Sequence, residues 1–569
     1  MGVALGLTLA ACGGGGGGGS GASQQSTVQD QKPVQTTAPA PAPTQFTDVT
    51  TTTGIDYSVG YRNYYSVGYG SSSYFAGLDE VLAHMAIGGA AAGDYDADGD
   101  IDVFITPGDI GPNLLYRNSG LGVFTEVAAA AGLAFTATST ESYRHSSPAF
   151  ADMNGDGHLD LFIGGMFGDP SLIYRNNGDG TFSNVTPGSG IDTLEAKHNI
   201  SAAFGDYDLD GDLDLFVTHW GTQRNLLDVG DTEHLWRNDT SGGTITFSSV
   251  SVEAGISPSI LTLPDPEKVH PDHDWTFTPT FARINDDLYP DLLIVADFNR
   301  TQLFINNRDG TFSNQTDVFV LTDQNGMGSA VGDYDNDGDL DWFVTAIYEP
   351  NHLLWHGNHF YQNEGGVFVK RTDELGVRDG GWGWGTCFMD FENDGDLDIY
   401  LTNGYDLEGE YHFDRSRAYV SSGGNFLDRA QTLGLDDTYQ GRGVVCADFD
   451  NDGDVDILQL HLGSSFDSAA TMWRNDTSGN NYLRVKLNGY AQNTEAAGAR
   501  IYVTVGSVTQ MHEIMIGNNY ISQNPTIQVF GLGTASQADQ VRVEWPDGTE
   551  TIQSAVNAGQ TMIIEYSAP

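Results

Sequence analysis

Short apolar runs, separated by turn residues, recur along most of the chain. A run such as residues 161–163 is too short for a helix, and its Asp- and Gly-rich flanks are typical of strand ends. Two further elements recur, one like Leu-Tyr-Arg-Asn and one like Phe-x-x-Val, and the turn between Tyr174 and Phe182 predicts a hairpin. Each repeat is predicted to form four strands: one apolar run before an acidic loop, one apolar run after it, and the two strands of the hairpin.

The acidic loop sets the period of the repeat. It reads Asp-x-Asp-x-Asp-Gly-x-x-Asp and first begins at Asp94. Near-copies begin at Asp152, Asp206, Asp333, Asp390 and Asp448, and a divergent copy begins at Arg283. The seven starts, from residue 94 to residue 448, lie 59 residues apart on average. Seven repeats of four strands predict an all-β fold, a seven-bladed β-propeller.

The ends of the repeat region favour a closed ring over a solenoid. The first Phe-x-x-Val element, at Phe46, has no Tyr-Arg-Asn strand before it, and the last such strand, at Trp473, has no Phe-x-x-Val element after it. Pairing these two strands leaves no open sheet edge. We therefore expect the propeller to span residues 46–479. Residues 480–569, where apolar and polar residues alternate as in 501–505, are predicted to form a small β-sandwich-like domain.

The charge balance limits the partners of the protein. Acidic residues number 77 against 24 basic ones, which gives a formal net charge of −53. Nucleic acid and anionic membrane surfaces would repel such a field, so neither is an expected partner. Cations bound at the acidic loops would offset this charge.

The loop pattern predicts calcium sites. Ca²⁺ takes six to eight oxygen ligands, and alternate Asp side chains in a Gly-containing turn supply them. We number the loop from its first residue, so that Asp94 is position one of the first loop. Side chains at positions one, three, five and nine, with the carbonyl of position seven, would surround one ion. The predicted residues of the six loops are Asp94, Asp96, Asp98, Asp100 and Asp102; Asp152, Asn154, Asp156, His158 and Asp160; Asp206, Asp208, Asp210, Asp212 and Asp214; Asp333, Asp335, Asp337, Asp339 and Asp341; Asp390, Glu392, Asp394, Asp396 and Asp398; and Asp448, Asp450, Asp452, Asp454 and Asp456.

The fourth loop is predicted to hold no metal. It begins at Arg283 and lacks both the first carboxylate and the turn glycine. We expect the guanidinium of Arg283 to take the place of the cation and to pair with Asp287 or Asp291.

The N-terminus has the pattern of an export signal. Residues 1–12 contain a short apolar run, and Leu9-Ala-Ala-Cys12 resembles the lipobox of bacterial lipoproteins, in which the cysteine is lipidated. Residues 13–45 are rich in Gly, Ser, Thr and Pro and are predicted to form a flexible tether. The protein is thus expected to be exported and anchored through Cys12 at the bacterial outer membrane or cell surface, with secretion as the alternative. This anchor would be its only contact with a membrane.

At this point the chain resembles a known family. The loops resemble the FG-GAP or VCBS repeats of integrin α-subunit propellers and bacterial surface proteins. The tail resembles the ASPIC/UnbV domain, in the arrangement found in the cartilage-acidic-protein-like family. Its matching segments are Tyr482-Leu-Arg-Val-Lys-Leu, Gly498-Ala-Arg500, Ser522-Gln523, Phe530-Gly-Leu-Gly533 and Val543-Glu-Trp545-Pro-Asp-Gly548. The resemblance implies an extracellular, calcium-binding adhesion or recognition module without catalytic residues.

Aromatic and histidine residues recur before and after the loops, and should gather on the face opposite them. The residues concerned are His145, His198, His219, Trp220, Trp275, Trp382 and His461. They could form the polar rim of a water-filled channel, a site for an extracellular glycan or protein, or a catalytic or transition-metal centre. Cys387 and Cys446 lie three and two residues before their loops, and this offset is expected to point them to opposite faces of their blades as free thiols.

Three classes of function follow. The first is a cell-surface module that recognises a carbohydrate or a protein, and the second is a structural surface lipoprotein without a small ligand. The third, an enzyme with a histidine-containing site opposite the loops, is less expected because no nucleophile elbow, zinc-protease helix or phosphate-binding loop is present.

Overall fold

The computed structural model describes residues 46–56, 85–86, 88–194, 198–223, 234–257, 260, 273–285, 287–321, 323–350, 352, 355–405, 411, 413–462, 470–490 and 492–568. The predicted signal segment with Cys12 and the predicted tether lie outside these residues. Residues Pro43–Pro569 form one compact unit. None of the helices in the described residues has the length and apolar character needed to cross a membrane.

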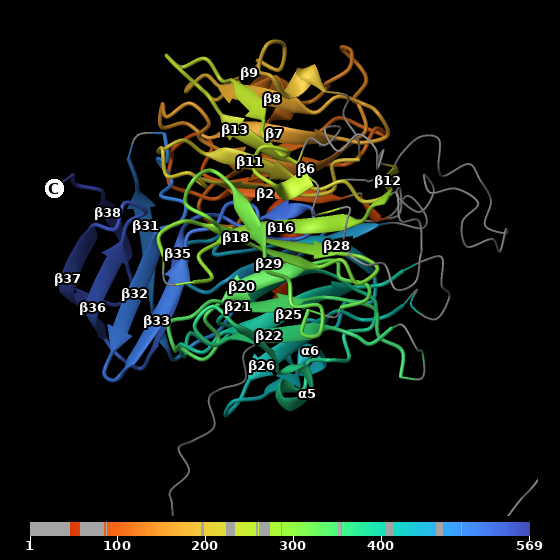
Figure 1. Cartoon of the computed structure of the whole chain (residues 1–569). Coiled ribbons are helices and arrows are strands. Elements are labelled where there is room, and N and C mark those ends of the chain that lie inside the picture. The colour runs from red at the N-terminus through yellow and green to blue at the C-terminus, as the bar shows by residue number, and fades with distance from the viewer. Residues whose placement is uncertain are drawn as a thin grey trace, which may run out of the picture. The chain divides into compact units, whose positions relative to one another are not determined.

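Each repeat forms one antiparallel sheet in the described part of the chain (Figure 1). Its first two strands enclose the acidic loop, and its third and fourth strands form the predicted hairpin. The first three sheets consist of β2 (Gly89–Gly93), β3 (Asp102–Thr106), β4 (Leu114–Asn118) and β5 (Phe124–Glu126); of β6 (His145–Ala151), β7 (Asp160–Gly165), β8 (Leu172–Asn176) and β9 (Phe182–Asn184); and of β10 (Ala202–Gly205), β11 (Asp214–Val217), β13 (Leu235–Asn238) and β14 (Phe247–Ser249).

The remaining sheets follow the same order, and the predicted all-β fold is confirmed. They consist of β16 (Thr276–Ala282), β17 (Asp291–Ala296), β18 (Gln302–Asn306) and β19 (Phe312–Asn314); of β20 (Ser329–Gly332), β21 (Asp341–Val344), β22 (His359–Asn363) and β23 (Phe368–Lys370); of β24 (Gly383–Met389), β25 (Asp398–Asn403), β26 (Arg417–Ser421) and β27 (Phe426–Asp428); and of β28 (Gln440–Ala447), β29 (Asp456–Leu462), β30 (Thr471–Asn475) and β1 (Phe46–Asp48).

The predicted pairing of the first and last strands is confirmed. Strand β1 runs antiparallel to β30, with Phe46 opposite Asn475 and Asp48 opposite Trp473. The first strands of successive sheets contact one another in chain order, and β28 in turn contacts β2. This is the arrangement of a β-propeller, in which the pairing of β1 with β30 completes the last sheet and closes the ring.

Short helical turns follow the last strand of several sheets. They are α1 (Thr50–Thr53), α3 (Ala128–Ala131), α5 (Thr372–Leu375) and α6 (Ala430–Leu433), and a 3₁₀ turn, η1, spans Ile191–Thr193. Each of the four α-helical turns ends at a glycine with a left-handed φ of 79° to 84°. This conformation explains the Gly-Ile and Gly-Leu pairs of the repeat, because glycine adopts it without a steric penalty and the next residue can then turn into the core. A two-stranded ribbon, β12 (Thr222–Gln223) with β15 (His273–Asp274), connects the third and fourth repeats.

The C-terminal strands form two sheets around one core, as predicted. One sheet has the order β35-β31-β38 and the other β33-β32-β36-β37. Leu483, Ile501, Phe530 and Val541, from both sheets, share one buried cluster. The strands are β31 (Asn481–Asn488), β32 (Arg500–Val505), β33 (Val508–Glu513), β35 (Gln528–Gly533), β36 (Gln537–Glu544), β37 (Glu550–Asn557) and β38 (Thr561–Glu565).

A loop of the C-terminal domain lies among the first strands of the repeats, which the sequence did not predict. In this segment, residues 515–524, Ile516 pairs with Phe204, and β34 (Ser522–Gln523) runs parallel to β2. The Gln523 side chain donates to the carbonyl of Phe150 and accepts from its N–H, at 2.8 and 2.7 Å. We call residues 515–524 the plug segment.

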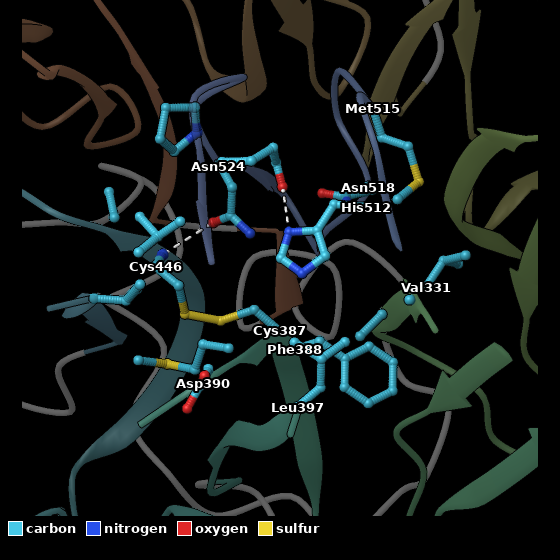
Figure 2. Close-up of a pocket in the computed structure, with 18 of the residues that line it drawn as sticks. Val331, Cys387, Phe388, Asp390, Leu397, Cys446, His512, Met515, Asn518 and Asn524 are labelled. Atoms are coloured by element: carbon cyan, nitrogen blue, oxygen red, sulfur yellow. Dashed lines mark hydrogen bonds between the residues drawn. A yellow bond between two sulfur atoms is a disulfide. The ribbon is translucent and has the colours of Figure 1, made fainter. Parts of the chain in front are cut away.

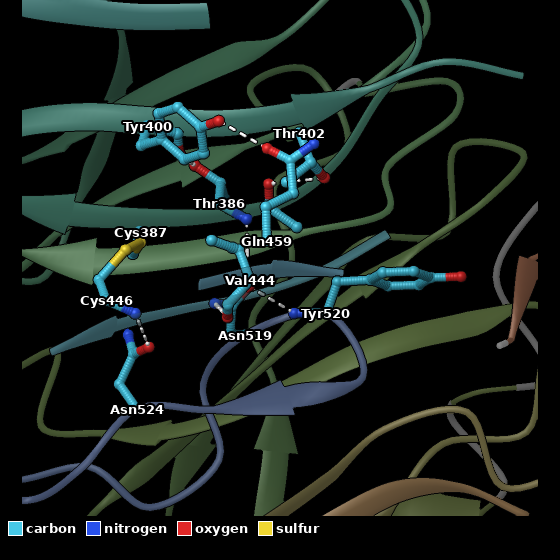
Figure 3. The surroundings of a disulfide bond; sticks show 11 residues. Thr386, Cys387, Tyr400, Thr402, Val444, Cys446, Gln459, Asn519, Tyr520 and Asn524 are labelled. Atoms are coloured by element: carbon cyan, nitrogen blue, oxygen red, sulfur yellow. Dashed lines mark hydrogen bonds between the residues drawn. A yellow bond between two sulfur atoms is a disulfide. The ribbon is translucent and has the colours of Figure 1, made fainter. Parts of the chain in front are cut away.

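The expectation of two free thiols is wrong. Cys387 in β24 and Cys446 in β28 form a disulfide, with Cα atoms 6.8 Å apart (Figure 3). The sequence argument placed the two side chains on opposite faces of their own sheets. In a ring, however, one face of each sheet packs against the opposite face of the next. Residues on opposite faces of neighbouring sheets therefore meet, and both cysteines lie in one apolar cluster.

Candidate metal centres

Carboxylate oxygens converge at five of the acidic loops. In the first loop, one oxygen from each of Asp94, Asp96 and Asp102 lies within 4.8 Å of the other two. The corresponding groups in the described residues are Asp206, Asp208 and Asp210; Asp333, Asp335 and Asp341; Asp390, Glu392 and Asp398; and Asp448, Asp450 and Asp456. Positions one, three and nine thus meet in four loops, and positions one, three and five meet in the third repeat.

Several of these oxygens are buried without a hydrogen-bond donor. They are the Oδ1 atoms of Asp94, Asp96, Asp206, Asp208 and Asp450. A buried carboxylate oxygen that accepts no hydrogen bond is costly unless a cation compensates it. Because the donors are oxygens alone, the residues present fit a hard cation such as Ca²⁺.

When no cation is bound, burial makes the carboxylates of the acidic loops resist ionisation. Desolvation, with smaller contributions from neighbouring aspartates, raises the pKa of Asp102 to about 8 and that of Asp341 to about 9. The same causes raise the pKa of Asp390 and of Asp398 well above the usual value. A bound cation favours the ionised form, so cation binding and proton release are coupled at these loops.

The ninth-position aspartate also has a structural role. In the first loop, Asp102 accepts the N–H of Asn118 at 2.8 Å and the N–H of Tyr95 at 3.3 Å. In the fourth repeat, Asp291 accepts the N–H groups of Asn306 and Ile284 in the same way. The carboxylate therefore ties the loop to the third strand whether or not a metal is bound, which explains why the fourth loop keeps it.

The second loop has a carboxamide where the others have a third-position carboxylate. Asp152 accepts the N–H of Gly155 at 2.8 Å and that of Gly157 at 2.7 Å, and the second contact recurs in other loops, as from Gly99 to Asp94. Asn154 accepts the N–H of Asp156 at 2.9 Å. The loop thus keeps the fold of its relatives and offers an amide oxygen in place of one carboxylate.

Side chains at position seven contact neighbouring parts of the molecule. Asp100 accepts from Asn451 of the last repeat at 2.9 Å, and Asp454 accepts from Asn393 at 2.6 Å. These side chains thus point to neighbouring loops, which leaves only the main-chain carbonyl of position seven as the predicted ligand.

The pairing predicted for Arg283 is wrong. Its guanidinium does not pair with the side chain of Asp287 or Asp291; Nε donates to the main-chain carbonyl of Asp287 at 2.9 Å. The terminal nitrogen pairs with Glu544 of the C-terminal domain at 2.6 Å. Arg308 pairs with the Asp287 carboxylate instead, at 2.7 Å. The sequence argument considered only partners within the loop, whereas the carboxylate that pairs with Arg283 is Glu544 of the C-terminal domain.

The C-terminal domain supplies polar groups to several acidic loops. Nζ of Lys486 lies 3.1 Å from Asp94, and Nε of Arg484 lies 3.2 Å from Asp448. The Thr494 hydroxyl donates to Asp152 at 2.8 Å. The loops are therefore partly covered by the C-terminal domain. Sequence analysis missed these contacts because each joins the C-terminal domain to a loop of the repeats, two of them across more than 300 residues.

The predicted tryptophans come together but are buried. Trp220, Trp275 and Trp382 belong to one apolar cluster, with exposed fractions of 5%, 1% and 7%. Tyr520 of the plug segment belongs to the same cluster and lies against Trp384, with ring centres 5.4 Å apart. The structure thus confirms that the three tryptophans gather, and their role in ligand binding stays a prediction.

The predicted histidines are held at separate places. His461 lies 2.9 Å from Asp437, and Nδ1 of His198 accepts the N–H of Phe167. The ring of His219 lies 4.7 Å from that of His234. Burial lowers the pKa of His145 to about 4. Within the described residues, the metal-ligand clusters consist of loop carboxylates and none contains a histidine.

A cavity of about 120 Å³ lies between the C-terminal domain and the fifth to seventh sheets (Figure 2). Its lining includes the disulfide, His512 and Asn524, and it reaches the first-position residues Asp390 and Asp448. Burial lowers the pKa of His512 to about 4, so its ring is neutral near pH 7. Sequence analysis did not single out this cavity, because its walls come from two domains.

Comparisons with known proteins agree with the repeats and the tail. The family "ASPIC and UnbV" matches residues 489–569, and the family "FG-GAP-like repeat" matches residues 94–163, 152–217 and 283–344. Cartilage acidic protein 1 of Mus musculus is 24% identical over 525 residues, which cover 84% of this chain and 74% of that protein. The Homo sapiens protein is 24% identical over 521 residues, which cover 84% and 72%.

The chain also has a weak similarity to two solved structures. An Agrocybe aegerita lectin that recognises non-reducing terminal N-acetylglucosamine is 15% identical, with a TM-score of 0.37, and the match covers 65% of this chain and 89% of that one. A GH74 xyloglucanase from Xanthomonas campestris is 11% identical, with a TM-score of 0.39, over 83% and 73% of the two chains.

Proposed function

Because the chain carries FG-GAP-like repeats and an ASPIC and UnbV domain and is homologous to cartilage acidic protein 1, we propose that it is an exported recognition module whose repeats bind calcium. Ca²⁺ would be held at six loops by the carboxylates and by Asn154, and the fourth loop would remain metal-free. When bound, the ion would neutralise the converging carboxylates and hold each loop to its sheet.

The observation that carries the calcium proposal is the convergence of buried, unpartnered oxygens. In the first loop, Oδ1 of Asp94 and Oδ1 of Asp96 are buried without a donor, and a carboxylate oxygen of Asp102 lies close to both side chains. Without a cation, such a group costs free energy through desolvation and repulsion. By linkage, a site at 100 times its dissociation constant contributes about 2.7 kcal/mol, so several sites would dominate the stability of the repeats.

The test is metal analysis combined with thermal unfolding of residues 46–569. We expect near-stoichiometric calcium at the acidic loops, and a large fall in melting temperature after chelation with EGTA that added Ca²⁺ reverses. Magnesium at the same concentration should restore less, because Mg²⁺ demands a smaller octahedral site. A protein that contains no calcium and melts at the same temperature with and without EGTA would refute the proposal.

For recognition, we propose a site on the face opposite the acidic loops. The candidate residue is Trp355, which is half-buried beside Trp382. Its ring stacks on that of His352, with the ring centres 4.1 Å apart, and its ring centre lies 5.8 Å from that of Trp382. Partly exposed tryptophans of this kind bind the apolar faces of sugars and the side chains of proteins. We propose that the protein acts there by binding a carbohydrate or a protein, without turnover.

Ligand binding can be followed by the fluorescence of these tryptophans. An array of glycans identifies candidate ligands, and the best of them is then titrated against the wild type and against Trp355→Ala. We expect the substitution to weaken binding about tenfold or more, the usual cost of removing a central aromatic contact. Trp545→Phe, a change in the C-terminal core, is the matched control. Equal affinities of the wild type and Trp355→Ala would exclude this surface.

The cellular location is also a proposal. The lipobox-like sequence at Cys12 favours a lipid-anchored exported protein. The Cys387–Cys446 disulfide supports export, because disulfides persist in oxidising compartments and are rare in the cytosol. Metabolic labelling with a fatty-acid analogue should mark the wild type and not Cys12→Ser. Equal labelling of both proteins would place any lipid elsewhere.

A further inference from the structure

The fourth repeat contacts the C-terminal domain with the charges reversed. At the first and seventh repeats, the loop supplies the carboxylate and the C-terminal domain supplies the cation, Lys486 or Arg484. At the fourth repeat, the loop supplies the cation, Arg283, and the C-terminal domain supplies the carboxylate of Glu544, 2.6 Å away.

The contact extends into a network of two arginines and two glutamates, with Arg542 3.6 Å from Glu544 at its edge. The N–H of Arg283 donates to Glu513 at 2.9 Å, and Nε of Arg500 donates to the other oxygen of Glu513 at 2.8 Å. Arg500 also donates to the carbonyl of Arg283. The side chains of Arg283, Arg500 and Glu513 are 3%, 8% and 1% exposed, and that of Glu544, at the edge of the network, is 21% exposed. Ion pairs this well buried and hydrogen-bonded lose much free energy when one partner is removed.

The two kinds of contact depend differently on the cation. Asp94 and Asp448 would serve both the metal and the C-terminal domain, so their positions depend on the ion that holds the loop together. In the fourth repeat, Arg283 already donates to the carbonyl of its own loop and pairs with Glu544, and it needs no ion.

We propose that the network of Arg283, Arg500, Glu513 and Glu544 is a metal-independent latch that keeps the C-terminal domain docked when the other loops lose their cations. This inference rests on the proposed calcium binding at those loops. It also gives a role to the divergent fourth loop, in which an anchor between domains takes the place of a metal site.

The latch lies next to the plug segment. Glu513 ends β33, immediately before the turn into residues 515–524. In the docked domain, the N–H of Ile521 donates to Ser201 at 3.0 Å, and Asn519 bonds to the main chain of Thr386 and Val444 (Figure 3). Exchange of the plug amides with deuterium therefore reports whether the C-terminal domain remains docked.

The experiment measures hydrogen–deuterium exchange of residues 515–524 in the full chain, in Ca²⁺ and in EGTA. The variants are Arg283→Met and Glu544→Gln, the second of which removes a charge and keeps the shape. Arg237→Met is the matched control, since Arg237 pairs with Asp239 of its own repeat. In Ca²⁺, all four proteins should exchange within about twofold of one another, because the remaining loops hold the domain.

In EGTA, we expect the plug amides to exchange roughly tenfold or more faster in Arg283→Met and Glu544→Gln than in the wild type and Arg237→Met. Equal rates in EGTA would overturn the latch, and so would the same acceleration in Ca²⁺ and in EGTA. If Arg283→Met does not fold, Glu544→Gln decides. A wild type that contains no calcium refutes the proposed function, whereas the comparison of variants in EGTA still tests the latch.

Discussion

Nδ2 of Asn118 lies 2.7 Å from the carbonyl oxygen of Phe449 and so joins the first repeat to the last. The same side chain donates to the carbonyl of Ile101 in its own loop, at 3.0 Å. Equivalent contacts to the preceding repeat are Asn176 with Tyr95, Asn238 with Met153, Asn306 with Tyr207, Asn363 with Ile284, and Asn475 with Phe391. In six repeats the Leu-Tyr-Arg-Asn-like element therefore ends in an asparagine whose side chain links neighbouring sheets, whereas the sixth repeat has Ser421 at this position.

Replacing Asn118 by alanine should weaken this link. The change leaves the buried carbonyls of Ile101 and Phe449 without the Nδ2 donor, and we expect the free energy of unfolding to fall by about 1–3 kcal/mol. Denaturant unfolding in Ca²⁺ measures the difference. Asn177→Ala, at an exposed turn position, should change the stability by no more than about 0.5 kcal/mol. If the two variants are equally stable, the asparagine does not link the repeats.

Removing the disulfide should loosen the junction between the sixth and seventh repeats. We expect Cys387→Ser combined with Cys446→Ser to unfold with a free energy lower by about 2–4 kcal/mol, because the bridge closes a segment of 59 residues. The wild type treated with a reductant under unfolding conditions should approach the same value. The double variant should not respond to the reductant, and a response would show that another group is being reduced.

Replacing aspartate by asparagine should affect calcium binding and stability differently at the third and at the ninth position of the loop. Asp291→Asn leaves one of two N–H groups without its acceptor and should cost about 1–3 kcal/mol with no change in bound calcium. Asp96→Asn gives the first loop the third-position amide that Asn154 provides in the second, so it should weaken calcium binding there without abolishing it, and its effect on stability should largely disappear in EGTA. Metal analysis and melting with and without EGTA distinguish the two. Loss of calcium in Asp291→Asn would contradict the metal-free fourth loop.

The pH dependence of the metal-free protein follows from its raised carboxyl pKa values. The pKa of Asp102 and that of Asp206 rise from 3.8 to about 8 on folding. The folded protein therefore binds more protons than the unfolded chain within this window, and its stability falls as the pH rises from about 4 to about 8. We expect the melting temperature in EGTA to decline over this range.

Saturating Ca²⁺ should weaken or reverse this decline, because the ion stabilises the ionised carboxylates. Parallel melting curves in Ca²⁺ and in EGTA across the range would show that these groups do not bind the ion.

The repeat period and the ring closure could be predicted from sequence because both are local patterns. Phe46 and Trp473 belong to elements that are each incomplete alone, and this made their pairing recognisable. The plug segment could not be predicted, because Ser522 and Gln523 look like an ordinary short strand and Phe150 lies 373 residues away. For the same reason the burial of Trp275 was missed: Tyr520, which belongs to the same cluster, comes from another domain.

The pairing of β1 with β30 has a consequence for biosynthesis. Thr47 and Asp476, which bond across the closing sheet, are separated by 429 residues. At about 5–20 residues per second, the ribosome makes the second strand roughly 20–90 seconds after the first. During that time β1 lacks the sheet that it completes, so ring closure is a late event. A chain that crosses a membrane unfolded, and folds only after its last repeat has arrived, would avoid exposing that unpaired strand to other nascent proteins.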